Sequence, residues 1–543
     1  ALLDGTTRQR LLAQERLVEA GEYAVPKLLQ KLQIANDAST SRKVKSMLIQ
    51  IGRDAVLPLQ TALPFLDNNS QILVANVLGE IGDTHSAPSL LALASDSVEA
   101  PDVRDAARRA LERIGIAPNT NLSTMQTVVA KQFYEGQPSV LPPAIGGHNV
   151  FWVWDPTAQL DVLDDVQEEI FDDVMAMYFA SQAIASDSEN TGAMSVFVAA
   201  NLRRNREQQG KEDLVFGNLP YSPEFYATVF GPEIAQMVLS KALEDGDTSL
   251  ALDAIAALSR TAGAGSLVGG TDTPLVAAMY YPDRNVQYES ALTIAATLPN
   301  NSFEGSYRVV PLLASAVRNG GEMFALVIGD DENSRREVST LLNENNWSVV
   351  GSGTTALESI ETAGAVPGFD LVVVIARSAN HGELVVEELA SMPETTVTPV
   401  LVLANSSDTQ ILNNTLGDSS MVEIAKDGVS DSAKLAVIED LLGAASGGRL
   451  SFEEQAEFAT RALAVLRDIA LAETILKVDD SSGTLIAALN DSDFESKSII
   501  AQTLSMINDS VAQRALVDAA LSGGDLDQQV MLLDEAAASV RRW

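Results

Sequence analysis

The chain has no cysteine and only three histidines among its 543 residues. Thiol chemistry, iron–sulfur clusters and the usual zinc sites therefore lack their ligands. Basic side chains are also scarce, because 36 Lys and Arg stand against 74 Asp and Glu, for a net charge of −38. Such a surface repels phosphate, so binding to nucleic acid is excluded. No run of about 18 consecutive apolar residues occurs, so no transmembrane span is predicted.

What is present is typical of a folded protein. The hydrophobic fraction is 46% and the charged fraction 20%, and the length predicts several domains or one long repeat array. The absence of cysteine favours an extracellular, periplasmic or cell-envelope location, with the cytoplasm as the alternative. Because the chain begins at Ala1 rather than Met, we expect either a removed leader or a trimmed start.

The amino-terminal part contains a repeated pattern. Leucine, three residues and glycine occur together four times, and the glycines are 31, 30 and 33 residues apart: Gly21, Gly52, Gly82 and Gly115. A stretch containing proline, at residues 24–28, 55–59 and 87–91, follows the first three glycines. Glycine suits the end of a helix and proline the first turn of the next. The pattern predicts two-helix units that bury their apolar stripes by stacking.

These units resemble HEAT-like repeats. The resemblance is carried best by Leu78-Gly79-Glu80-Ile81-Gly82-Asp83 together with the segment from Val103 to Leu111. Residues 1–117 are interpreted as HEAT-like repeats, and weaker units of the same kind are expected in residues 246–321 and 446–543. Members of that family are mostly binding scaffolds, so the resemblance implies a scaffold and no catalytic residue.

Residues 118–245 form a segment of their own between these repeats. The aromatic stretch 150–155 predicts one strand. Helices are expected over residues 163–185 and 191–208, as a hairpin that is tetratricopeptide-like but lacks the signature residues of that family.

Two polar clusters lie in this segment. Six acids repeat at i, i+4 and i+8 on one side of the first expected helix: Asp164, Glu168, Asp172, Asp165, Glu169 and Asp173. They could bind a divalent cation, although a solvated helix face is the favoured interpretation in so acidic a chain. Three arginines could bind a partner or form ordinary ion pairs, of which the latter is favoured: Arg203, Arg204 and Arg206.

Residues 322–445 have a different pattern. Apolar runs of strand length alternate with helical segments; the runs are residues 324–329, 347–350, 369–375, 399–404 and 421–424. Strands that are apolar on both faces belong to a parallel sheet covered by helices on both sides. The chain is therefore predicted to be mainly α, a HEAT-like α-solenoid, with an inserted flavodoxin-like α/β domain of five parallel strands.

The inserted domain resembles the receiver domain of two-component response regulators. The acidic pair Asp330-Asp331 follows the first strand, and Lys426 follows the fifth. The resemblance implies a phosphoryl-accepting aspartate at position 375 and a hydroxyl at 404, but the chain has Ile375 and Ala404 there. Without a carboxylate no acyl phosphate can form, so a pseudo-receiver is predicted. A vestigial Mg²⁺ site at Asp330 and Asp331 remains a hypothesis, and leftover solubilising acids are the favoured alternative.

Such a domain is expected to bind protein. Contacts are predicted on the side of its fourth and fifth strands, at Leu412, Leu416 and Met421. The predicted function is a non-catalytic scaffold without a cofactor that associates with itself as an oligomer or filament through its repeats, in an envelope or extracellular polymer. The alternative is a cytosolic signalling adaptor that binds a kinase or receiver. Gly351-Ser352-Gly353 and the segment 269–272 lack the Gly-Lys-Ser/Thr of a phosphate loop and are predicted to be turns.

Overall fold

A computed structural model describes residues 2, 6–34, 37–157, 159–208, 213, 215–261, 263, 265, 267, 273–317, 323–363, 369–392, 394–417, 419–447, 450–522 and 525–543. The chain divides into two compact units, Ala1–Phe230 and Gly231–Trp543. This division falls inside the segment 118–245 that the sequence indicates as one, because the last helix of that segment belongs to the second unit and packs on the repeat helix that follows it. None of the helices in the described ranges is long and apolar enough to cross a membrane.

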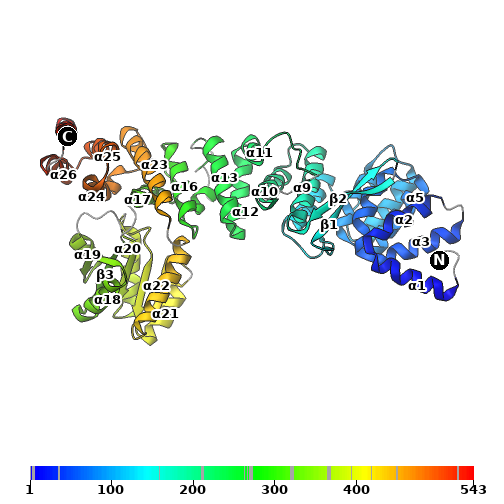
Figure 1. The fold of residues 1–543 in the computed structure, drawn as a ribbon, viewed down its shortest axis with the longest axis horizontal. Helices are drawn as coiled ribbons and strands as arrows, with labels where there is room; N and C mark the ends of the chain where they lie inside the picture. The colour runs from blue at the N-terminus through cyan, green and yellow to red at the C-terminus, as the bar shows by residue number, and fades with distance from the viewer. Residues whose placement is uncertain are drawn as a thin grey trace. The chain divides into compact units, whose positions relative to one another are not determined.

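The first unit begins with two stacked layers of helices (Figure 1). Its helices are α1(Thr7–Glu19), α2(Val25–Gln33), α3(Ala38–Ile51), α4(Val56–Ala62), α5(Asn68–Ile81), α6(Ala87–Ser95), α7(Pro101–Arg113) and α8(Leu122–Tyr134). In one layer α1, α3, α5 and α7 pack each on the next. In the other layer α2 contacts α4 and α6 contacts α8. The predicted helical repeats are therefore confirmed.

The repeat glycines end the helices as the sequence predicts. Gly21, Gly52, Gly82 and Gly115 all have positive φ, a conformation that only glycine adopts without strain. Gly79 has a different role, because a Cβ atom there would lie 2.8 Å from the Ala110 Cα. It lets α5 approach α7 closely.

A β-hairpin follows α8 and packs on the second layer. Its strands are β1(His148–Asp155) and β2(Gln159–Gln167), paired antiparallel with Trp154 opposite Leu160. The hairpin contacts α4 and α2. The predicted strand at 150–155 is present, but residues 163–167 belong to a strand and not to a helix. The unit ends with α9(Glu168–Ser186), α10(Thr191–Gln208) and α11(Pro223–Val229).

The second unit is again an array of stacked helices. They are α12(Pro232–Asp245), α13(Thr248–Thr261), α15(Pro274–Ala278), α16(Arg284–Ala296), α17(Val309–Ala316), α23(Phe452–Leu471), α24(Ser482–Asp491), α25(Phe494–Met506), α26(Ser510–Leu521) and α27(Leu526–Arg542). One layer runs α13, α16, α23, α25, α27, and each helix packs on its neighbour in that order. Because α23 packs on α16 and α17, the array continues across the domain inserted between them.

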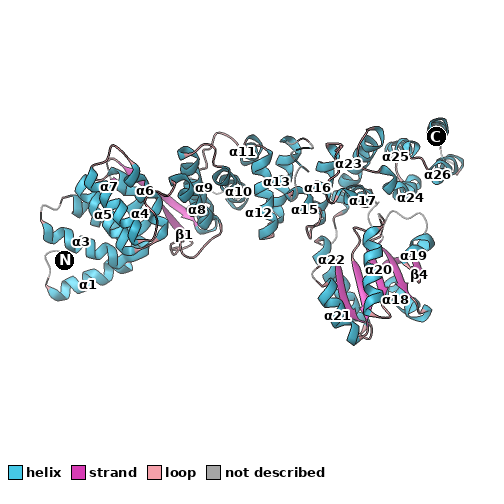
Figure 2. Cartoon of the chain, turned by 180° about the vertical axis from the view of Figure 1, so that it is seen from behind, coloured by secondary structure: helices cyan, strands magenta, loops and turns pink. Residues whose placement is uncertain are grey.

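That inserted domain is a doubly wound α/β fold (Figure 2). Its elements are β3(Met323–Gly329), α18(Glu332–Glu344), β4(Trp347–Gly353), α19(Ala356–Ala363), β5(Leu371–Ile375), α20(Ala379–Ser391), β6(Val400–Ala404), α21(Ser406–Leu416), β7(Val422–Lys426) and α22(Asp431–Ser446). The strands are parallel in the order β4-β3-β5-β6-β7, which is the flavodoxin-like order. Buried side chains of α18 and α22 cover one face of the sheet, and those of α19, α20 and α21 cover the other.

Two hydrogen bonds from buried side chains join this domain to the repeats. Gln287 Nε2 of α16 donates to the Ala445 carbonyl at 3.0 Å, and Arg308 Nη1 donates to the Thr396 carbonyl at 3.1 Å. The Arg308 guanidinium also lies over the ring of Tyr280, 4.1 Å from its centre. The predicted mainly α fold with an inserted five-stranded parallel-sheet domain is confirmed.

Candidate functional site

The acidic pair after β3 is engaged by its own domain. Asp331 caps α18, where its Oδ2 accepts from the Ser334 amide at 2.8 Å, and these hydrogen bonds lower the pKa of Asp331. Asp330 Oδ2 lies 2.7 Å from Arg377 Nη1, in an exposed ion pair. In the part of the chain that the structure describes, no group of three or more His, Asp or Glu side chains could hold a metal ion. The Mg²⁺ site at these two residues stays a hypothesis.

The strand ends around this pair carry no phosphoryl-accepting group. Ile375 ends β5 and lies opposite Gly329 in the sheet, so close that a Cβ on Gly329 would be 2.9 Å from the Ile375 Cβ. Ala404 is buried at the end of β6, and Lys426, exposed, lies opposite it at the end of β7. The positions that the receiver resemblance marks therefore lie together at the carboxyl ends of the strands.

The three apolar side chains predicted to contact a partner do not share a surface. Leu412 is fully buried beneath α21 in the core of the domain, so the prediction is wrong for this residue. Leu416 packs at the margin of the same core, and Met421 packs against the core on the opposite face of the sheet. The exposed apolar residues on α20 and α21 are Leu384 and Ile411.

Arg203 and Arg204 form ion pairs inside the first unit, in agreement with the favoured sequence interpretation. Arg203 Nε donates to Asp173 at 2.9 Å, and its Nη2 donates to Asp172 at 3.2 Å. Arg204 pairs with Asp213, and both of these side chains are buried. Arg204 is buried, which corrects its assignment to an interaction surface. Arg203 is engaged by these carboxylates and remains partly exposed. Arg206, half-buried on the same helix, keeps its predicted role as a hypothesis.

The acidic stripe of the sequence does not form one helix face. Asp164 and Asp165 lie in β2 and the other four acids in α9. Asp173 is fully buried, and this burial raises its pKa to about 8 against the opposing hydrogen bond from Arg203. Burial acts to lower the pKa of Arg203, but the hydrogen bond to Asp173 raises it overall. Glu168 and Glu169 are exposed, as expected of a solvated face, whereas Asp172 and Asp173 belong to a partly internal ion pair with Arg203.

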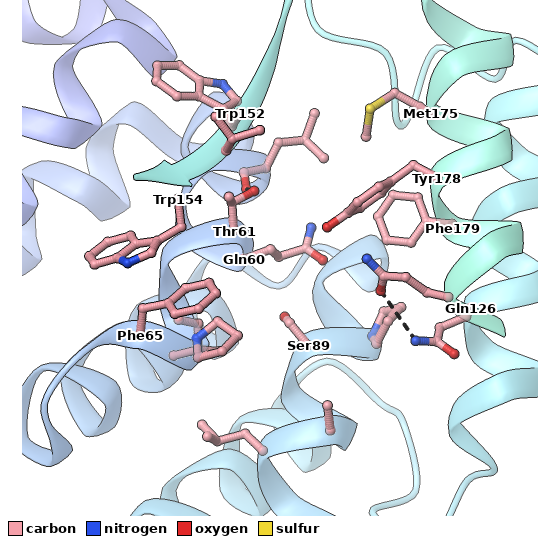
Figure 3. A pocket seen from close by; sticks show the side chains of 18 of the residues that line it. Gln60, Thr61, Phe65, Ser89, Gln126, Trp152, Trp154, Met175, Tyr178 and Phe179 are labelled. Carbon is pink, nitrogen blue, oxygen red and sulfur yellow. Dashed lines mark hydrogen bonds between the residues drawn. The ribbon is translucent and has the colours of Figure 1, made fainter. Parts of the chain in front are cut away.

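One concave feature of the first unit was not predicted. It is a cavity of about 560 Å³, lined by parts of α4, α6, α8, α9 and β1. Figure 3 shows Trp154 and Phe65 on one side of it, Tyr178 and Phe179 on the other, and Gln60 between them. The rings of Phe65 and Trp154 stack with centres 5.1 Å apart, and Phe151 meets Tyr178 edge to face.

The polar side chains of the cavity are glutamines, short hydroxyls and two carboxylates. Gln126 Nε2 donates to Gln182 Oε1 at 3.4 Å, and burial raises the pKa of Tyr178. Gln60 Nε2 is buried without a hydrogen-bond partner. Among the residues that the structure describes, no Lys, Arg or His lines the cavity. The sequence signal for this site was the aromatic stretch 150–155, which contains two of the four tryptophans.

Trp152 is fixed from outside the cavity. Its Nε1 donates to Glu22 Oε2 at 2.8 Å, and its ring meets Tyr23 edge to face. Glu22 is buried in the turn between α1 and α2, and this burial raises its pKa to about 7. The repeats thereby hold the hairpin that forms one wall of the cavity.

No family model and no curated protein matches the chain. Among solved structures, one that is similar is a circular tandem repeat protein with novel repeat topology and enhanced subunit contact surfaces. It is 12% identical over 98% of this chain and 96% of that chain, with a TM-score of 0.15. The repeat architecture rests on the stacked helices themselves.

Proposed function

We propose that this protein is a non-catalytic helical-repeat scaffold that associates with further copies of itself, and that its α/β domain is a receiver-like docking module that takes no phosphoryl group. The observation that carries the proposal is a pair of complementary surfaces, one on α27 and one between α1 and α3.

The surface on α27 is an exposed apolar stripe. Five residues at i, i+4, i+7, i+11 and i+14 lie on one side of the helix and are exposed: Leu526, Val530, Leu533, Ala537 and Val540. Leu526 is 74% exposed and Val540 66%. Asp527 and Asp534, also exposed, flank the stripe. Such a spacing is what an amphipathic helix presents to a hydrophobic groove.

The surface between α1 and α3 is a groove of about 450 Å³. One face of each helix lines it, with Thr7, Arg10, Leu11 and Gln14 from α1 and Ser39, Arg42, Lys43 and Ser46 from α3. Three of these side chains are cationic and none is acidic. Residues 1–53 contain nine Lys and Arg against five Asp and Glu, whereas the remainder of the chain contains 27 against 69. The groove therefore lies in the basic part of a very acidic protein.

The proposed occupant of the groove is α27 of a second copy. Its apolar stripe would pack on Leu11, an apolar side chain in a largely polar lining. Its aspartates match Arg10, Arg42 and Lys43 in charge, which favours association in one register. Because the two surfaces are different, the contact is heterologous, and repeating it builds an open polymer unless the rotation closes a ring.

Sedimentation velocity over a hundredfold range of protein concentration tests this proposal. We expect species larger than the monomer to grow with concentration, and Leu533→Asp to shift this growth to at least tenfold higher concentration. Leu357→Asp, at an exposed position of α19, is the matched control. A strictly monomeric protein at every concentration would overturn the proposal, and equal effects of both variants would overturn the assigned surface.

A charge exchange tests the register directly. Arg42→Glu should weaken association, and the second substitution Asp534→Arg in the same chain should restore part of it. Failure of the double variant to recover any association would show that these two residues do not meet.

A further inference from the structure

The cavity of the first unit has the composition of a ligand site rather than of a packing defect. Its volume of about 560 Å³ lies within the roughly 300–1,000 Å³ that is typical of small-molecule sites. Its walls are mostly aromatic and apolar, with Trp154 and Phe65 facing Tyr178 and Phe179 (Figure 3). Flat ring systems stack on such faces.

The charge of the lining excludes an anionic ligand. No cationic side chain of the described ranges lines the cavity, whereas Asp96 and Glu99 do. Both carboxylates are already held by neutral donors of the protein, because Asp96 Oδ1 accepts from the Val98 amide at 2.8 Å and Glu99 Oε1 accepts from Gln71 Nε2 at 3.2 Å. The ligand that fits this lining is uncharged.

One polar group in the cavity lacks a partner. Gln60 Nε2 is buried without a hydrogen bond, whereas Gln126 donates to Gln182, and Thr61 Oγ1 donates to the Leu57 carbonyl at 3.1 Å. A buried donor without an acceptor is costly. Since the amide of Gln60 lies between the two aromatic walls (Figure 3), an acceptor on a ligand held between them would satisfy it.

We propose that this cavity binds an uncharged, flat, ring-containing organic molecule that stacks on Trp154 and Tyr178 and accepts a hydrogen bond from Gln60. Trp152, held by Glu22, fixes the position of β1 and so keeps the aromatic walls apart. This site is separate from the α1–α3 groove and from α27, so the proposal does not depend on self-association.

The test uses three fluorescent probes with the full chain. Nile red is uncharged, planar and bears a ring carbonyl, diphenylhexatriene is uncharged without an acceptor, and anilinonaphthalene sulfonate is an anion. We expect Nile red to bind saturably, one molecule per chain, with energy transfer from tryptophan, and the anion to bind at least tenfold more weakly. No saturable binding of Nile red, or equal binding of the anion, would overturn the proposal.

Two variants locate the probe. Ala92 is exposed at the rim of the cavity, so Ala92→Trp should block the entrance and abolish binding without disturbing the fold. Ala444→Trp, at an exposed position of α22, is the control and should bind as the unaltered chain does. Equal binding by both variants would place the probe elsewhere and overturn the site.

A substitution of Gln60 tests the proposed hydrogen bond to the ligand. Gln60→Leu should weaken the binding of Nile red about 3- to 10-fold, as expected for one neutral hydrogen bond. The affinity for diphenylhexatriene should stay within about twofold of its value in the unaltered chain. Circular dichroism and the unfolding temperature establish that the variant is folded. Equal weakening of both probes, or of neither, would show that Gln60 does not recognise an acceptor.

Discussion

At the scale of single residues, two side chains far apart in sequence decide how the hairpin sits on the repeats. Trp152 needs an acceptor for its indole N–H, because its ring is buried and an unmade hydrogen bond there is costly. Glu22 provides this acceptor. The carboxyl group of Glu22 is itself buried, and the nearby carboxylate of Asp54 adds to the rise in its pKa. The arrangement makes the stability of the first unit depend on pH.

The pH dependence follows from the pKa of Glu22. Its pKa is about 7 in the folded chain against 4.5 ordinarily, so the folded state binds more protons than the unfolded state between these values. The unfolding free energy therefore falls as pH rises from about 4.5 to 7. Glu22→Gln keeps an acceptor for Trp152 without the charge, and should stabilise the unit above pH 7 by up to about 3 kcal/mol.

Urea unfolding at pH 5 and pH 8 measures this effect. Tryptophan fluorescence reports on the first unit alone when Trp347 and Trp543, both in the second unit, are replaced by Phe. Glu19→Gln, at an exposed position of α1, is the control and should leave the unfolding free energy unchanged at both pH values. A Glu22→Gln variant with the same pH dependence as the unaltered chain would contradict the assignment.

A second residue-scale prediction concerns the Asp330–Arg377 ion pair. Arg377 provides the positive charge beside Asp330, so a divalent cation must compete with it. Both side chains are exposed, and exposed pairs contribute at most about 1 kcal/mol. Arg377→Ala should therefore strengthen Mn²⁺ binding at this edge by about 2- to 5-fold, as measured by titration calorimetry or by paramagnetic broadening.

The matched control for this change is Arg336→Ala. Arg336 pairs with Glu332 at 2.7 Å in an equally exposed position of α18, and its removal should not alter Mn²⁺ binding. If both variants bind Mn²⁺ as the unaltered chain does, Asp330 is not a cation ligand and the vestigial-site hypothesis fails.

At the scale of elements, the helices and strands that could be predicted from the sequence are those marked by residues within or next to them. The glycines with positive φ and the prolines in first turns mark helix ends by themselves, so the helices of residues 7–113 were predictable. The five apolar runs likewise mark β3 to β7. The helix α21 was not foreseen, because it follows Asn405 with few apolar residues, and only its position over the sheet explains why Leu412 is buried.

The error at β2 has a long-range cause. The acids at i, i+4 and i+8 from Asp164 to Asp173 resemble a helix face, but pairing with the aromatic strand β1 places Val150 opposite Asp165 and extends the strand to Gln167. The cavity was missed for a similar reason. Its lining comes from segments around residues 60, 90, 126, 152 and 178, and only stacking of the repeats brings them together.

Continuity of the second helical array across the inserted domain gives an element-scale prediction. Arg461 of α23 makes a two-pronged pair with Glu289 of α16, with Nη2 2.7 Å from Oε2, across 172 residues of sequence. Arg461→Gln should lower the unfolding free energy of the second unit by about 0.5–1 kcal/mol, since the pair is partly exposed.

The control for this prediction is another arginine of α23. Arg467 pairs with its sequence neighbour Asp468 at 3.2 Å and joins no second helix in this way, so Arg467→Gln should be neutral within about 0.3 kcal/mol. Chemical denaturation of each variant measures the unfolding free energy of the second unit. If the two substitutions cost the same, the Arg461–Glu289 pair does not help to join the array across the insertion.

At the scale of the whole molecule, the net charge of −38 opposes the approach of two copies, while the α27 stripe and the α1–α3 groove attract one another. The two effects have different ranges. Repulsion between whole chains acts over the Debye length, about 30 Å at 0.01 M salt and 10 Å at 0.1 M, whereas charge pairs buried in a contact are screened much less. Salt therefore removes the repulsion before it weakens the contact.

Association should accordingly be weakest at about 0.01 M salt, rise steeply towards about 0.15 M, and then level off. Light scattering at fixed protein concentration measures this, and Arg42→Glu should lower the plateau without moving the steep rise, because it alters the contact and barely alters the net charge. Association that is strongest at the lowest salt would mean that attraction between basic and acidic regions outweighs the overall charge. In that case the apolar stripe of α27 would not be the main source of affinity.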